Sequence, residues 1–151
     1  MSVKPQRQRI QSEDSNVPII LVVEDEEDNL LFISQALIFL QYNFITATEG
    51  KAAFDLADKY EIDLVLLDLV LPDISGFDLA NLYRQNQSTQ KMPIIAISAL
   101  ARDREREQAI RSGCNDYLVK PYFLEDLDRI IRQYLPQSSC SYSPPWLMQS
   151  N

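Results

Sequence analysis

Four short apolar segments of the sequence each end in a polar or charged group. If these segments are parallel strands, their carboxyl ends share one edge of the sheet, which is where ligands bind in open α/β folds. The sequence therefore predicts that three carboxylates, a hydroxyl and an ammonium group meet at one site. The segments are Ile19–Val23 before Glu24 and Asp25, Leu64–Leu67 before Asp68, Ile94–Ile97 before Ser98, and Tyr117–Val119 before Lys120.

Such a site favours a divalent cation beside an aspartate that accepts a phosphoryl group. The first segment is followed by five consecutive acids, residues 24–28, and not by the glycine-rich turn of a nucleotide-binding sheet. This acidic turn repels phosphate unless a cation intervenes, and a few carboxylates completed by water and phosphate oxygens suit magnesium. Asp68 is the candidate nucleophile, because carboxylates form aspartyl-phosphate intermediates. Lys120 and Ser98 would supply a positive charge and a hydrogen bond, as phosphoryl transfer requires.

The composition excludes several other chemistries. The 151-residue chain contains no histidine, which rules out a histidine base, a histidine metal ligand and an internal phosphohistidine. Two cysteines, Cys114 and Cys140, are too few for a disulfide framework or a zinc site. A net charge of −8 argues against direct nucleic-acid binding. No apolar stretch is long enough for membrane insertion and no signal peptide is visible, so we expect a cytoplasmic protein.

Strand-like and helix-like segments alternate strictly between residues 18 and 135. This alternation predicts an α/β fold with a parallel sheet and right-handed crossovers. The expected strands are Ile19–Val23, Phe44–Thr48, Leu64–Asp68, Ile94–Ser98 and Asp116–Val119. The expected helices are Asn29–Leu40, Lys51–Tyr60, Phe77–Asn86, Asp103–Ser112 and Leu124–Leu135.

We interpret the two ends of the chain as lying outside this folded unit. Residues 1–17 are polar and of mixed charge, which is typical of a flexible arm. Residues 136–151 contain serine and proline and are predicted to form a loose tail, in which Trp146-Leu147-Met148 is a candidate docking peptide. The tail is too short for an output domain, so we expect a stand-alone module.

Several motifs, taken together, resemble the receiver domain of two-component response regulators. The resemblance spans about Pro18 to Leu135 and implies the flavodoxin-like (βα)5 fold, a three-layer sandwich with a five-stranded parallel sheet of order 2-1-3-4-5. The charged start of the helix at 103–112 looks most like single-domain, chemotaxis-type regulators and the receivers of hybrid kinases. The matching segments are ILVVED at 20–25, LLDLVLPDISGF at 66–77, IAISA at 95–99 and GCNDYLVKP at 113–121.

The resemblance implies a role for each site residue. Asp68 is the phosphoacceptor, and Lys120 contacts the phosphoryl group. Ser98 is the switch hydroxyl and Tyr117 the switch aromatic, whose ring is expected to leave the outer face on phosphorylation. Magnesium, or manganese in its place, is held by Glu24, Asp25, Asp68 and the backbone carbonyl of Val70. The Lys120-Pro121 peptide bond is expected to be cis.

The implied function is phosphoacceptance in a two-component or phosphorelay pathway. A sensor histidine kinase or phosphotransfer protein would phosphorylate Asp68, and phosphorylation would switch binding to a downstream protein target that the sequence does not identify. The module would catalyse its own phosphotransfer only, and so would not be an enzyme in the usual sense. We expect a monomer or weak dimer.

Two alternatives remain open. A haloacid-dehalogenase-type phosphatase also uses a strand-end aspartate, but it carries a second aspartate two residues later, where this chain has Val70. A pseudo-receiver that only docks would usually lack the acid pair, the acceptor or the lysine, all of which are present.

One further expectation concerns the helix at 29–40. A core-facing stripe is formed by Ile33, Ala36, Leu37 and Leu40, whereas Leu31 and Ile38 lie on another side. Exposed apolar pairs often mark contacts with partners, so this helix is a candidate docking surface for the kinase.

Overall fold

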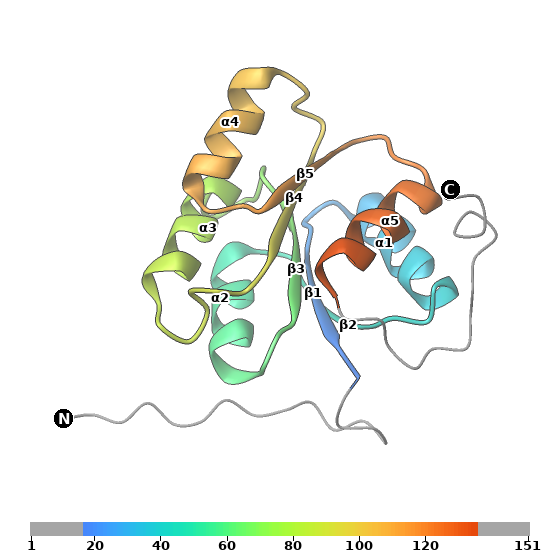
Figure 1. The fold of residues 1–151 in the computed structure, drawn as a ribbon, viewed down its shortest axis with the longest axis horizontal. Helices are drawn as coiled ribbons and strands as arrows, with labels where there is room; N and C mark the ends of the chain where they lie inside the picture. The colour runs from blue at the N-terminus through green and yellow to red at the C-terminus, as the bar shows by residue number, and fades with distance from the viewer. Residues whose placement is uncertain (1–16, 136–151) are drawn as a thin grey trace.

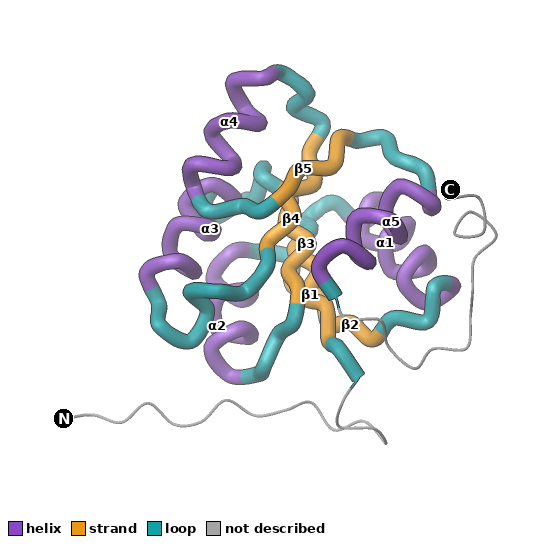
Figure 2. The backbone as a smooth tube through the Cα atoms, in the orientation of Figure 1, coloured by secondary structure: helices purple, strands orange, loops and turns teal. Residues whose placement is uncertain are grey.

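The structure is a computed structural model, and it describes residues 17–135 of the chain. Five strands alternate with five helices in this region, with the strands stacked through the middle of the molecule (Figures 1 and 2). The strands are β1 (Ile19–Val23), β2 (Asn43–Ala47), β3 (Leu64–Asp68), β4 (Ile94–Ser98) and β5 (Asp116–Val119). The helices are α1 (Glu27–Phe39), α2 (Gly50–Lys59), α3 (Gly76–Gln85), α4 (Asp103–Ser112) and α5 (Leu124–Tyr134).

All strand pairs are parallel, and the strand order is β2-β1-β3-β4-β5, which confirms the predicted topology. Every residue of β1, β3 and β4 is buried. Such continuous burial explains why these three strands are apolar nearly throughout, since helices cover both faces of a parallel sheet. The residues after each strand therefore emerge at one edge of the sheet.

The sheet separates two hydrophobic cores. Ile20 and Val22 of β1 point toward α1 and α5, whereas Leu21 and Val23 point toward the side of α2, α3 and α4. Figure 1 shows these two helical layers on opposite sides of the strands. The alternation follows from the two-residue period of a strand, which sends successive side chains to opposite faces.

Most predicted boundaries agree with the structure to within one residue. The exception is α1, which starts at Glu27, two residues before the predicted start. Acidic residues favour the positive end of the helix dipole, so Glu27 and Asp28 extend the first turn. No helix within residues 17–135 is long and apolar enough to cross a membrane.

Two glycines allow backbone segments to approach closely near the ends of the strands. A Cβ on Gly76 would lie 2.6 Å from the carbonyl oxygen of Asp68, so this glycine lets α3 start directly against the end of β3. Gly113 ends α4 with a φ of 118°, a left-handed conformation that glycine adopts without steric cost.

The predicted arm and tail, residues 1–17 and 136–151, lie outside the described residues apart from Val17. The same holds for Cys140 and for the candidate docking peptide Trp146–Met148. These assignments stay predictions.

Candidate functional site

Three carboxylates gather where β1 and β3 end. Oxygen atoms of Glu24, Asp25 and Asp68 all lie within 4.8 Å of one another. Glu24 and Asp68 are buried, whereas Asp25 is exposed. Each strand delivers its acid at the same sheet edge, because β1 and β3 are neighbours in a parallel register. The structure therefore brings together the acids that the sequence placed at one edge.

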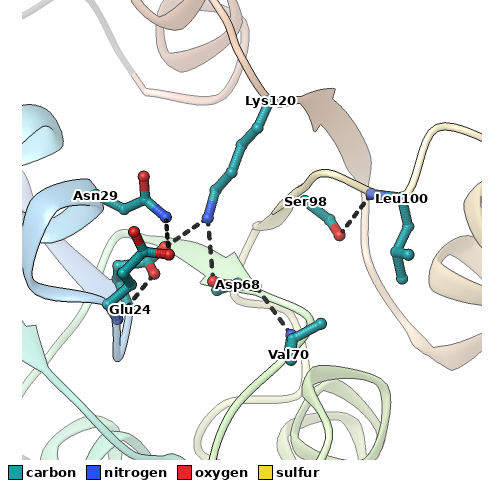
Figure 3. A network of polar contacts seen from close by, with 8 residues as sticks. Glu24, Asn29, Asp68, Val70, Ser98, Leu100 and Lys120 are labelled. Carbon is teal, nitrogen blue, oxygen red and sulfur yellow. Dashed lines mark hydrogen bonds and ion pairs between the residues drawn. The ribbon is translucent and has the colours of Figure 1, made fainter.

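Lys120 connects two of these carboxylates, as Figure 3 shows. Its Nζ atom lies 2.9 Å from Oε2 of Glu24 and 3.1 Å from Oδ2 of Asp68. Burial raises the pKa of Glu24, an effect that the hydrogen bond from Lys120 opposes. Burial alone would lower the pKa of Lys120, but the two carboxylates outweigh it and the net shift is upward. The ammonium group thus stays charged and compensates part of the negative charge at the sheet edge.

The donor set fits a hard divalent cation. Magnesium prefers carboxylate and carbonyl oxygens and usually keeps several waters, so it needs only a few protein ligands. The cluster of Glu24, Asp25 and Asp68 offers three carboxylates, and the exposure of Asp25 leaves the site open to solvent.

The loop after β3 folds back onto the candidate acceptor. The backbone N–H of Val70 donates a hydrogen bond to Oδ1 of Asp68 at 2.9 Å. This bond holds the start of the loop beside the carboxylate, and Val70 itself is 62% exposed.

Ser98 lies at the same edge, but its hydroxyl group is turned toward Leu100. The backbone N–H of Leu100 donates to Oγ of Ser98 at 3.1 Å, and Figure 3 shows the two residues facing each other, away from Asp68. The sequence placed Ser98 near the acceptor correctly, whereas its rotamer follows from this local hydrogen bond.

Tyr117 occupies a position that differs from the expected one. The residue is only 8% exposed, and its hydroxyl donates to the backbone carbonyl of Leu100. The guanidinium group of Arg106 on α4 lies 5.5 Å from the ring centroid. We expected the ring on the outer face in the absence of a phosphoryl group, and the structure corrects this: the ring packs inward between the sheet and α4.

Sequence reasoning missed two contributions to the site region. Asp73 accepts hydrogen bonds from the backbone N–H groups of Gly50 and Lys51, at 2.7 and 2.8 Å, and so joins the loop after β3 to the start of α2. Phe32 of α1 helps to line a cavity that reaches Asp68. An aspartate in a loop is a typical helix cap, but its distant partner in α2 could not be found from local sequence. The expected cis peptide bond between Lys120 and Pro121 is confirmed.

This geometry defines a class of protein: a doubly wound α/β module with an acid cluster, a lysine and a hydroxyl at the carboxyl edge of its sheet. The response regulator receiver domain model matches residues 20–132. The chain belongs to this family. Members of the family are signalling modules that interact with histidine kinases and downstream targets.

Relatives with curated names agree with the assignment. The chain is 33% identical over 123 residues to a probable cyclic di-GMP phosphodiesterase of Vibrio cholerae, covering 82% of this chain and 28% of that protein. It is 38% identical over 116 residues to the response regulator ArlR of Staphylococcus aureus, covering 77% of this chain and 52% of that protein. The chain thus spans about a quarter to a half of the length of these relatives.

A solved structure shares the fold of this chain. The receiver domain of sensor histidine kinase PA1611 from Pseudomonas aeruginosa is 32% identical, with a TM-score of 0.74. The match covers 78% of this chain and 97% of that one. That structure contains a magnesium ion coordinated in the active site cleft.

Proposed function

We propose that Asp68 accepts a phosphoryl group from a partner sensor histidine kinase or phosphotransfer protein. The observation that carries this proposal is the contact of one ammonium group, that of Lys120, with both Asp68 and Glu24 inside a cluster of three carboxylates. A cluster with such an excess of acids is suited to binding a cation and a phosphoryl group together.

The residues that would hold the cation are Glu24, Asp25, Asp68 and the backbone carbonyl of Val70. Bound magnesium, or manganese, would reduce the repulsion between Asp68 and the incoming phosphoryl oxygens. Lys120 would then shift from the carboxylates toward the phosphoryl oxygens, which its flexible stem permits.

The loop after β4 would transmit the event. In the proposed phosphorylated state, the Ser98 hydroxyl turns toward the phosphoryl group and gives up its bond from the Leu100 N–H. The backbone carbonyl of Leu100 also accepts the hydrogen bond from the Tyr117 hydroxyl, so a movement of this loop would change the position of the Tyr117 ring. The surface formed by α4, β5 and α5 would carry the change to a downstream protein target.

The module would catalyse only its own phosphotransfer. The phosphodiesterase name of one relative belongs to a protein of which this chain matches 28%, and we do not extend that activity to this chain. A cytoplasmic location and a monomeric or weakly dimeric state stay predictions from the sequence.

The test is incubation of the full chain with acetyl phosphate and magnesium, followed by intact-mass measurement. We expect one added phosphoryl group, no addition with a chelator, and no addition to the Asp68→Asn variant. Equal labelling of that variant would contradict the proposal.

A further inference from the structure

A cavity of about 570 Å³ extends from Asp68 between α1 and the sheet. Its floor is apolar, formed by buried side chains of β1, β3 and β4: Val22, Leu66 and Ile97. Ile33 of α1 closes it from the side of the helix. This size is within the range of pockets that bind small molecules, which are mostly apolar with a few polar groups.

Two aromatic residues form a wall of the cavity near the surface. The rings of Phe32 on α1 and Tyr122 in the loop after β5 lie 5.6 Å apart between centroids, in an edge-on arrangement at 64°. Phe32 is 50% exposed, which places its ring where a ligand entering from solvent would contact it. Aromatic rings favour such edge and offset contacts with a further ring.

The charges of the cavity lie close together. Glu24, Asp68 and Lys120 are joined by the two ion pairs at the sheet edge, whereas the floor and the aromatic wall carry no charge. With a divalent cation held by the carboxylates, a complementary ligand would carry a phosphoryl group at one end and an apolar body at the other.

We propose that this cavity accommodates the leaving group of a small-molecule phosphodonor, namely an acyl phosphate whose acyl group is aromatic or otherwise bulky and apolar. The inference rests on the proposed function of Asp68 and adds a substrate class to it. Phe32 is the residue that would determine the preference for such a donor over acetyl phosphate.

The chemical step balances without a redox partner. A carboxylate oxygen of Asp68 forms the new bond to phosphorus, and the bond between phosphorus and the acyl oxygen breaks. The electron pair of the broken bond leaves with the carboxylate product, benzoate in the case of benzoyl phosphate. No proton transfer is required, because both the attacking and the leaving group are carboxylates.

The test compares benzoyl phosphate with acetyl phosphate on the full chain in the presence of magnesium. Intact mass distinguishes an added phosphoryl group from a benzoyl group, and Asp68→Asn identifies the labelled residue. At equal subsaturating concentrations we expect benzoyl phosphate to label Asp68 about tenfold faster, which corresponds to about 1.4 kcal/mol. The Phe32→Ala variant should bring the ratio of the two rates close to one.

Phe39→Ala is the matched control. Phe39 lies on the same helix, is 56% exposed, and does not line the cavity. This variant should keep the wild-type ratio. Phe32→Leu, which removes the ring but keeps much of the apolar volume, serves as a second variant should the alanine variant fail to fold.

Binding without phosphotransfer provides an independent measurement. Ligand-observed NMR with phenylphosphonate should show saturation transfer to the phenyl protons in the wild type and in Phe39→Ala, and a weaker transfer in Phe32→Ala. A wild-type rate ratio near one, or a ratio that Phe32→Ala and Phe32→Leu leave unchanged, would overturn the inference while acetyl phosphate labelling still supports the proposed function. If neither donor labels Asp68, both fail.

Discussion

At the scale of single residues, the main feature of the site is that its carboxylates outnumber its positively charged side chains. One ammonium group, that of Lys120, serves two buried carboxylates, Glu24 and Asp68, while Asp25 contributes a third carboxylate from the surface. A buried charge is tolerated when it is paired and hydrogen-bonded, as here. Part of the negative charge is therefore not compensated by the protein, and a bound divalent cation would compensate it. A phosphoryl acceptor that depends on a divalent cation is the function that fits these charges best.

Hydroxyl groups elsewhere in the core allow a first test of the packing. Tyr83 of α3 is fully buried and stacks on Phe54 of α2, with ring centroids 5.9 Å apart. Within the described residues its hydroxyl has no hydrogen-bond partner. Because an unsatisfied buried hydroxyl is unfavourable, Tyr83→Phe should leave the free energy of unfolding unchanged or raise it by up to about 1 kcal/mol in urea denaturation.

Tyr42→Phe is the control for this change. The hydroxyl of Tyr42 donates to Oδ1 of the buried Asp128 at 2.9 Å. Its removal should lower the free energy of unfolding by about 1.5–3 kcal/mol, the range for hydrogen bonds to charged groups. A large loss in Tyr83→Phe, or no loss in Tyr42→Phe, would contradict the packing described here.

At the scale of elements, Asp73 fixes α2 to the loop that follows the candidate acceptor strand. Its carboxylate accepts the backbone N–H groups of Gly50 and Lys51 in the first turn of α2. These hydrogen bonds lower the pKa of Asp73 below its ordinary value of 3.8. The stabilisation that they provide is therefore complete above pH 3.8 and is lost as the pH falls through the lower, folded-state pKa.

The pH dependence gives a second prediction. Asp73→Ala should be less stable than the wild type at neutral pH, and the difference should shrink as the carboxyl group becomes protonated in acid. Urea denaturation at neutral pH and at about pH 3 measures both differences.

Ser75→Ala is the matched control, because the Ser75 hydroxyl caps α3 by accepting the backbone N–H of Asp78 at 3.1 Å and does not titrate in this range. The loss in free energy of unfolding of Ser75→Ala relative to the wild type should be the same at both pH values. A deficit of Asp73→Ala that does not depend on pH would show that the carboxylate charge does not stabilise α2.

The exposed side of α1 supports a third prediction, about docking. Leu31 and Ile38 are 56% and 65% exposed, as the sequence predicted, and Phe32 and Phe39 extend the apolar surface. If the kinase docks on this surface, Leu31→Glu should slow phosphotransfer from the kinase by tenfold or more while acetyl phosphate still labels Asp68. The kinase is first identified by phosphotransfer profiling.

Gln35→Glu separates charge from apolar contact. Gln35 is also exposed on α1, so this variant adds the same charge without removing an apolar side chain. It should transfer phosphate nearly as fast as the wild type. Equal slowing by both variants would indicate charge repulsion, and loss with both donors would indicate misfolding.

At the scale of the whole molecule, the sheet positions the chemistry, and this part was readable from sequence. Apolar strands that end in Glu24, Asp68 and Ser98 are sufficient to predict a parallel sheet and a shared edge. The alternation of strands and helices also accounts for most boundaries, with the two additional acidic residues at the start of α1 as the exception.

The details that sequence could not predict depend on contacts between distant segments. The inward position of Tyr117 on β5 depends on its contacts with the Leu100 carbonyl in the loop after β4 and with the Arg106 guanidinium group on α4. The cavity beside Asp68 depends on the distance between α1 and the sheet, and Asp73 caps the start of α2, which precedes it by more than twenty residues. Local patterns carry no information on these distances.

The central claim is that Asp68 accepts the phosphoryl group. Reductive trapping tests it most directly: borohydride converts an aspartyl phosphate to homoserine, and peptide mass spectrometry then locates the modified residue. After acetyl phosphate and magnesium, homoserine should be found at position 68 and be absent when a chelator is present. Homoserine at Asp25 or Asp73 in place of Asp68, or at no position despite a phosphorylated intact mass, would contradict the account.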